Sequence, residues 1–151
     1  MKKIIFVRYG EKENGQLSQK GIETMTLTAE KLKPIIQNQN THIICADIDR
    51  AISSAEIISK HLNILFVKNF SELYASDEKN IFPNIEIATE IINLEGKKCD
   101  ILIAVISREY IETLPNYILK TLGSKEIVET HLNRGEALIL DYDMKGILFN
   151  N

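Results

Sequence analysis

The stretch Lys3-Ile4-Ile5-Phe6-Val7-Arg8-Tyr9-Gly10-Glu11 decides the fold class of this chain. It opens with a short apolar run, which is typical of a buried strand, and Gly10 then marks a turn. We therefore predict a strand over residues 3–7 that ends directly before Arg8 and Tyr9. Both side chains are then candidates for a site at the end of that strand.

The rest of the chain alternates between strand patterns and helix patterns. The predicted strands are 42–45, 64–67, 101–106, 137–142 and 147–149, with residues 70–83 irregular and a turn at 143–146. Apolar residues at spacings of three and four predict helices, whose core faces are Ile22, Met25, Ala29, Leu32 and Ile36; Ile52, Ala55, Ile58 and Leu62; Ile85, Ala88 and Ile91; and Ile111, Leu114, Ile118 and Leu122. The expected N-caps are Ser18, Asp47 or Asp49, and Asn84.

Repeated strand–helix units predict an α/β protein, a three-layer α/β/α sandwich with a mainly parallel sheet. Ligands of such sheets bind beyond the carboxyl ends of the strands, where helix N-termini attract anions. Several polar residues follow predicted strand ends, so we expect them to converge on one pocket: Arg8, Tyr9, Arg50, Ser107 and Arg108.

Length and composition exclude several classes of protein. A chain of 151 residues predicts one domain, residues 1–151. The net charge of −3 gives no nucleic-acid footprint, and no apolar run approaches the roughly 18 residues of a membrane span. Met1-Lys2-Lys3 begins like a signal peptide, but Arg8 ends the apolar run after four residues. Cys45 and Cys99 form no disulfide framework, so we expect a cytoplasmic protein that binds neither nucleic acid nor membrane.

The sequence offers no metal or cofactor motif. His42, His61 and His131 lack the spacing of metal ligands, and the two cysteines form no CxxC pair. P-loop and GxGxxG patterns are also absent. We therefore predict a site with no metal and no cofactor.

Five segments together resemble the histidine phosphatase (phosphoglycerate mutase-like) superfamily, nearest its short bacterial phosphohistidine phosphatases. They follow the family's order and run from the first strand almost to the end of the chain: Arg8-Tyr9-Gly10-Glu11, Leu17-Ser18-Gln19-Lys20-Gly21, Asp49-Arg50-Ala51-Ile52-Ser53-Ser54-Ala55-Glu56, Ile101-Leu102-Ile103-Ala104-Val105-Ile106-Ser107-Arg108 and Gly135-Glu136-Ala137-Leu138-Ile139-Leu140-Asp141-Tyr142. The resemblance implies a phosphoglycerate mutase-like fold, with Arg8 and Arg50 as phosphate clamps.

The departures from the family fall on its chemistry. The resemblance implies a histidine that takes the phosphoryl group at position 9 and a second one that stabilises it at position 108, but Tyr9 and Arg108 stand there. A phenol is a poor nucleophile near pH 7 because its unperturbed pKa is about 10. Arginine is always charged and is a strong phosphate ligand. The substitutions therefore remove the catalyst and keep, or strengthen, anion binding.

The family's proton donor is usually an acid in the loop after the third strand. Glu72 lies in that loop, as do Asp77 and Glu78, and no motif fixes which of them serves. A Glu72 side chain that faces the pocket could equally pair with Arg108. Arg108 itself is either a pocket residue or an outward partner of Glu109 or Glu112.

Three hypotheses follow for function. The leading one is a pseudoenzyme, which binds a phosphate-bearing small molecule or phosphoprotein through Arg8, Arg50, Arg108 and Tyr9 without efficient turnover. The first alternative is an active phosphatase with altered catalytic residues. The second is a protein-interaction scaffold whose pocket is vestigial, with Arg8 and Arg50 paired to Glu72, Asp47 or Asp49. The oligomeric state stays open.

Overall fold

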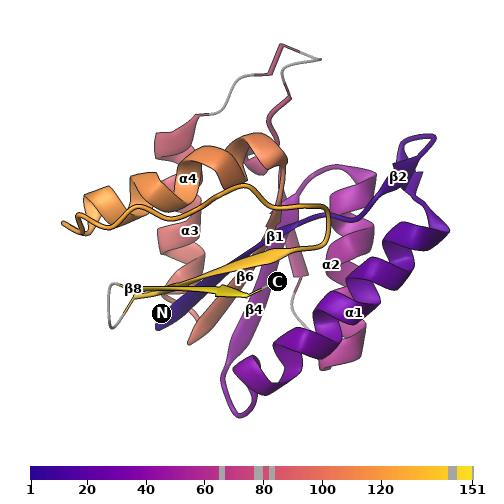
Figure 1. The fold of residues 1–151 in the computed structure, drawn as a ribbon, viewed down its shortest axis with the longest axis horizontal. Helices are drawn as coiled ribbons and strands as arrows, with labels where there is room; N and C mark the ends of the chain where they lie inside the picture. The colour runs from indigo at the N-terminus through magenta and orange to yellow at the C-terminus, as the bar shows by residue number, and fades with distance from the viewer. Residues whose placement is uncertain (65–66, 77–79, 82–83, 143–145, 151) are drawn as a thin grey trace.

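A single mixed sheet runs through the centre of the molecule (Figure 1). The structure is a computed structural model that describes residues 1–64, 67–76, 80–81, 84–142 and 146–150. The strand order is β5-β4-β6-β1-β7-β8, in which the first four strands are parallel and β7 and β8 are antiparallel to their neighbours. The strands are β1 (Lys3–Arg8), β4 (Thr41–Ala46), β5 (Val67–Phe70), β6 (Ile101–Ile106), β7 (Ala137–Asp141) and β8 (Gly146–Asn150).

Helices cover both faces of this sheet. The first pair, α1 (Gln19–Ile36) and α2 (Asp49–Leu62), packs together on one face, and the second pair, α3 (Ile85–Gly96) and α4 (Arg108–Thr121), packs on the other (Figure 1). This arrangement confirms the predicted three-layer α/β/α sandwich with a mainly parallel sheet. A short hairpin, β2 (Lys12–Glu13) and β3 (Gln16–Leu17), and a 3₁₀ turn, η1 (Ser71–Leu73), complete the described elements.

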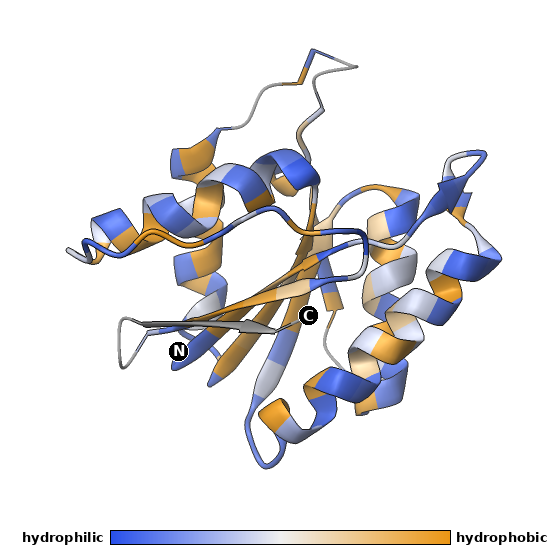
Figure 2. Cartoon of the chain, in the orientation of Figure 1, coloured by the Kyte–Doolittle hydropathy of each residue, from blue (hydrophilic) through white to orange (hydrophobic). Residues whose placement is uncertain are grey.

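The hydrophobic core lies along the central strands, which are the most apolar part of the molecule (Figure 2). All six residues of β6 are buried, and so are Ile4–Val7 of β1. A strand with helices on both faces buries both rows of side chains, so it reads as a continuous apolar run. That is why β1 and β6 could be predicted from sequence. The buried apolar residues form one cluster.

Two of the predicted helix caps are confirmed and one is wrong. Ser18 Oγ accepts a hydrogen bond from Gly21 N at 3.0 Å, and Asn84 Oδ1 accepts one from Ile87 N at 3.2 Å. Neither Asp47 nor Asp49 caps α2, because Ile48 occupies that position without a side-chain bond. Asp47 instead accepts a hydrogen bond from Asn69 Nδ2 of β5 at 2.7 Å.

Several predicted boundaries and faces shift. The strand predicted over 64–67 is β5, which begins at Val67, while residues 65–66 lie outside the described residues. β5 is an edge strand with exposed side chains at Lys68 and Asn69, so its apolar signal is weak. Ile22, predicted for the core, is 39% exposed. Residues 77–79, 82–83 and 143–145, which include Asp77, Glu78 and most of the predicted turn, also lie outside the described residues.

Candidate functional site

The carboxyl ends of β1 and β6 and the start of α2 meet at a cavity of about 130 Å³, which we call the cationic pocket. Its lining brings together Arg8, Tyr9, Arg50 and Arg108, as the strand ends predict. Ser107 lies beside it but is not part of the lining. The described residues that line it are Arg8, Tyr9, Lys12, Arg50, Ala75, Ser76, Arg108, Glu109 and Arg134.

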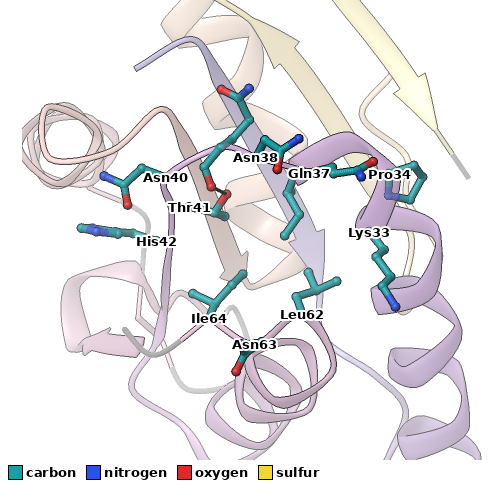
Figure 3. Close-up of a pocket in the computed structure, with 12 residues that line it drawn as sticks. Lys33, Pro34, Gln37, Asn38, Asn40, Thr41, His42, Leu62, Asn63 and Ile64 are labelled. Carbon is teal, nitrogen blue, oxygen red and sulfur yellow. Dashed lines mark hydrogen bonds between the residues drawn. The ribbon is translucent and has the colours of Figure 1, made fainter.

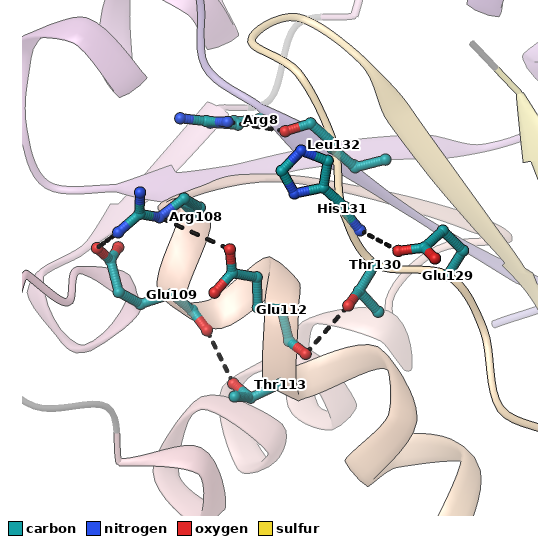
Figure 4. A network of polar contacts seen from close by, with 9 residues as sticks. All are labelled: Arg8, Arg108, Glu109, Glu112, Thr113, Glu129, Thr130, His131 and Leu132. Carbon is teal, nitrogen blue, oxygen red and sulfur yellow. Dashed lines mark hydrogen bonds and ion pairs between the residues drawn. The ribbon is translucent and has the colours of Figure 1, made fainter.

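Arg8 is held at the end of β1 by backbone and side-chain bonds. Its main chain exchanges hydrogen bonds with the loop before β7, and Arg8 Nη1 donates to the carbonyl of Leu132 at 2.8 Å (Figure 4). Arg8 Nε is buried and has no hydrogen-bond partner among the described residues. Burial lowers the pKa of Arg8, and the nearby charges of Arg134 and Arg108 lower it further. Arg8 is therefore a fixed guanidinium that has no carboxylate partner within 4.0 Å among the described residues.

Arg50 and Tyr9 hold each other in place. Arg50 is the second residue of α2, and its Nη2 donates to the Tyr9 hydroxyl at 3.2 Å. The guanidinium also lies over the phenol ring, with Cζ 4.8 Å from the ring centroid, a cation–π geometry. Burial lowers the pKa of Arg50, but contacts with the hydroxyls of Tyr9 and Tyr74 outweigh it, so the net shift is upward. Arg50 Nε is buried without a partner in the described part of the chain.

Arg108 both lines the cationic pocket and forms ion pairs. It is the first residue of α4, and its Nη2 lies 3.5 Å from Glu109 Oε1 while its Nε lies 3.7 Å from Glu112 Oε1 (Figure 4). From the sequence, Arg108 is either a pocket residue or a partner of Glu109 or Glu112, and in the structure it is both. Because half of its side chain is exposed, these pairs contribute little to stability.

Ser107 adds an unused donor next to these arginines. It is fully buried at the N-cap of α4, yet its Oγ makes no cap bond and has no partner in the described residues. An unpaired buried hydroxyl costs about 1–3 kcal/mol.

Comparison with known proteins gives the fold its name. No protein-family model matches the chain, and no curated protein matches its sequence. Solved structures do match: the protein histidine phosphatase SixA complexed with tungstate has a TM-score of 0.70 at 14% identity, covering 98% of this chain and 94% of that one. The chain has the histidine phosphatase fold.

Two further structures of this fold agree over nearly the whole chain. Phosphoglycerate mutase from Plasmodium falciparum has a TM-score of 0.63 at 21% identity and covers 99% of this chain and 88% of its own. The alpha-ribazole phosphatase from Shigella flexneri has a TM-score of 0.65 at 13% identity, with coverages of 98% and 94%. At such identities the likeness establishes the histidine phosphatase fold and leaves function to the site.

Glu72, the sequence's candidate acid, does not line the cationic pocket. Its exposed carboxylate accepts a hydrogen bond from Ser71 Oγ at 3.2 Å, and its backbone carbonyl accepts one from Tyr110 Oη at 3.0 Å. Glu72 makes no ion pair with Arg108, whose carboxylate partners are Glu109 and Glu112. The carboxylate that lines the pocket, within the described ranges, is Glu109.

The ion pairs expected of a vestigial pocket are also absent from the described residues. No carboxylate there lies within 4.0 Å of the guanidinium of Arg8 or Arg50, and Asp47 is engaged by Asn69 instead. The described residues likewise contain no group of three His, Cys, Asp or Glu that could hold a metal ion. None of the described helices is long and apolar enough to cross a membrane.

Two further cations were missed from the sequence. Lys12 reaches the pocket from the β2–β3 hairpin, and Arg134 reaches it from the loop before β7. The hairpin carried a signal, because Asn14-Gly15 favours a tight turn and both residues have positive φ, 52° and 81°. No local sequence signal indicates the position of Arg134, because its loop is placed by tertiary contacts.

A larger cavity of about 740 Å³ lies elsewhere and contains none of the predicted site residues. It is at the opposite end of the sheet, where β4 begins at Thr41, and amide side chains such as Gln37 and Asn40 line much of it (Figure 3). Size therefore does not locate the site. The strand carboxyl ends and the clustered cations do.

Proposed function

We propose that this protein binds a phosphate-bearing ligand, either a small molecule or a phosphorylated protein, without efficient turnover. The observation that carries the proposal is that Arg8 and Arg50 meet at one small cavity, each with a buried Nε and neither with a carboxylate partner among the described residues. A buried donor without a partner is costly, and a tetrahedral oxyanion between two guanidinium forks would accept from both. Tyr9 forms a wall of this site, and Arg108 adds charge at its edge.

Weak turnover is proposed from what stands in the two histidine positions. The Tyr9 hydroxyl accepts a hydrogen bond from Arg50, so this phenol serves to orient a cation. The guanidinium of Arg108 cannot give or take a proton near neutral pH. Neither residue supplies an imidazole, and losing one such transition-state donor costs about 100- to 1000-fold in rate.

The structural neighbours support a phosphate ligand. One was solved with tungstate, a tetrahedral oxyanion like phosphate, and others are named as phosphatases or as a mutase of a phosphorylated acid. A scaffold with a vestigial pocket gains no support, because Arg8 and Arg50 lack carboxylate partners in the residues described.

The two buried free cysteines, Cys45 and Cys99, accord with a reducing cytoplasm as the proposed location.

Thermal unfolding in inorganic phosphate tests the proposal. At constant ionic strength, phosphate at ten times its Kd should raise Tm by about 3–6 °C, because a ligand that binds only the folded state stabilises it. The gain should disappear in Arg50→Ala and persist in Lys125→Ala, a charge-matched change at an exposed residue outside the pocket. The same wild-type protein should hydrolyse p-nitrophenyl phosphate negligibly.

Two results would count against the proposal. An equal phosphate shift in wild type and Arg50→Ala would place the anion elsewhere and favour the scaffold. Hydrolysis near one turnover per second, abolished by Tyr9→Phe, would identify an active phosphatase.

A further inference from the structure

The cationic pocket holds more positive charge than one phosphate neutralises. Among the described residues, five cationic side chains and one carboxylate line it, although the chain as a whole carries a net charge of −3. Among the cations, Arg108 is balanced by Glu109 and Glu112. A phosphate monoester carries about −1.5 to −2 at pH 7, which would match Arg8 and Arg50. The positive charges of Lys12 and Arg134 would then remain without a matching negative charge on the ligand.

Arg134 reaches the pocket from a loop that is hydrogen-bonded to α4. Residues 122–136 run back along α4, where Asn116 exchanges side-chain hydrogen bonds with the backbone of Val128 at 2.8 and 3.2 Å. The Glu136 carboxylate accepts from the backbone and side chain of Asn133, so it is engaged beside Arg134 and forms no ion pair with it. The exposed guanidinium of Arg134 has no ion-pair partner within the described part of the chain.

Gly135 fixes the direction in which this loop turns. Its φ is +83°, and a Cβ there would lie 2.3 Å from Thr24 Cγ2 of α1. Only glycine tolerates both the conformation and this close approach. The backbone of Gly135 is further bonded to Arg8 O at 2.8 Å, which keeps Arg134 in register with the phosphate clamp.

Lys12 approaches the pocket from another element. It lies in β2, paired in register with Leu17 of β3, and the hairpin stands beside the start of α1 (Figure 1). The neighbouring Glu11 pairs with Lys20 at 3.7 Å, whereas Lys12 forms no ion pair with any described residue. The hairpin and the loop before β7 thus each bring to the pocket one cation that has no ion-pair partner among the described residues.

We propose that the ligand carries two phosphate groups, the first between Arg8 and Arg50 and the second at the rim between Lys12 and Arg134. The inference rests on the proposed function and narrows it to ligands with a diphosphate or two nearby phosphates. A cavity of about 130 Å³ is small, so the second group lies at the mouth, where both rim cations are exposed. Arg134 also depresses the pKa of Arg8 through space, which places the rim charge close to the inner site.

Titration calorimetry with inorganic phosphate and pyrophosphate tests this inference. At fixed ionic strength and without divalent ions, wild type should bind pyrophosphate at least about tenfold more tightly than phosphate, since the second group gains charge-assisted hydrogen bonds. Lys12→Gln with Arg134→Gln should weaken pyrophosphate binding at least about tenfold and phosphate binding no more than about threefold. Lys2→Gln with Lys125→Gln is the charge-matched control, because neither residue lines the pocket.

A second comparison separates recognition of phosphate groups from charge alone. Tricarballylate has three carboxylates and should bind more weakly than pyrophosphate, although the two carry similar charge. Tm of each variant shows that it is folded, and both substituted rim side chains are exposed. Pyrophosphate binding no tighter than phosphate binding, or an equal loss of both in the rim variant, would overturn the inference while leaving an Arg50-dependent phosphate site intact. If neither anion binds wild type, the proposed function and this inference both fail.

Discussion

Tyr9 and Arg50 form a mutually supporting pair at the cationic pocket. A histidine at position 9 could offer a ring nitrogen to an incoming phosphoryl group, but the phenol accepts a hydrogen bond from Arg50 at 3.2 Å and its ring lies against the Arg50 guanidinium. Arg50 thereby stays charged and oriented without a carboxylate partner among the residues described. Under the proposed function, Tyr9 is therefore a positioning group and not a reacting group. Binding and chemistry thus become separable at single residues.

This separation predicts a partial rescue of catalysis. Tyr9→His with Arg108→His restores an imidazole at both positions, so the double variant should gain phosphatase activity that neither single variant shows, because such residues act as a unit. The gain should be small, since Glu72 does not line the pocket and Glu109 is its described carboxylate. The measurement is acid-labile phosphate trapped on the protein after brief exposure to a phosphoryl donor.

Wild type and the two single variants are the controls for that label. A folded double variant that binds phosphate but never acquires the label would show that more than these two positions separates the chain from an active enzyme. Acid-stable phosphate on Tyr9 of wild type would contradict the pseudoenzyme proposal, whereas acid-labile label on wild type would mean that a histidine outside the described pocket lining is phosphorylated and that the label does not report position 9.

At the scale of elements, an ion triad ties the edge of the sheet to a helix. Glu95 of α3 is buried, and its Oε1 accepts hydrogen bonds from Lys98 at 2.9 Å and from Lys68 of β5 at 3.2 Å. Burial alone would raise the pKa of Glu95, but the two ammonium groups outweigh burial and lower it below its ordinary 4.5. The edge strand β5, which buries little apolar surface, is thus attached to α3 through Lys68 as well as to β4.

The triad predicts a pH-dependent loss of stability. A carboxyl whose folded pKa lies below its unfolded value stabilises the protein above that unfolded value, and this stability is lost as pH falls through the folded pKa. Glu95→Gln should therefore lower the free energy of unfolding by about 1–2 kcal/mol at pH 7, a modest value because both lysines are half exposed. Urea unfolding at pH 7 and pH 3.5 measures it, and the difference should shrink at the lower pH.

Glu90→Gln is the matched control for this prediction. Glu90 lies on the same helix, but it is exposed and forms no ion pair with the described residues, so its stability change should stay small at both pH values. A Glu95→Gln deficit that is the same at pH 3.5 and pH 7 would mean that packing, not charge, is what the substitution removes.

The same elements show what a sequence can and cannot predict. The buried strands β1 and β6 and the caps Ser18 and Asn84 were predictable because their signals are local. The position of β5 and the failure of Asp47 as a cap were not, because both depend on contacts between distant segments, such as the Asp47–Asn69 hydrogen bond. The residues of the site also fall into a group that could be predicted from the sequence and one that could not. Arg8, Tyr9, Arg50 and Arg108 follow strand ends, whereas Arg134 is placed by the packing of Gly135 against α1.

At the scale of the whole molecule, charge and stability are unevenly distributed. The net charge is −3, yet the described lining of the cationic pocket has five cations and one carboxylate, so the field at its mouth should attract anions. Salt should weaken this attraction, because it screens exposed charges beyond about 10 Å at 0.1 M. A ligand bound there stabilises the entire fold, since the pocket joins residues from β1, α2, α4 and the loop before β7.

The reactivity of the Cys45 thiol measures how ligand binding at the pocket changes global unfolding. Its side chain is fully buried in β4, and burial, with the charges of Asp47 and Glu56, raises the pKa of its thiol to about 12. At pH 8 roughly one native molecule in ten thousand would carry the reactive thiolate, so alkylation by iodoacetamide should proceed through unfolding. In a Cys99→Ser background, phosphate at ten times its Kd should slow labelling of Cys45 about tenfold, the factor by which it lowers the unfolded population. Adding Arg50→Ala to that background should remove the protection. If phosphate raises Tm but leaves the labelling rate of Cys45 unchanged, then β4 opens locally, without disturbing the site.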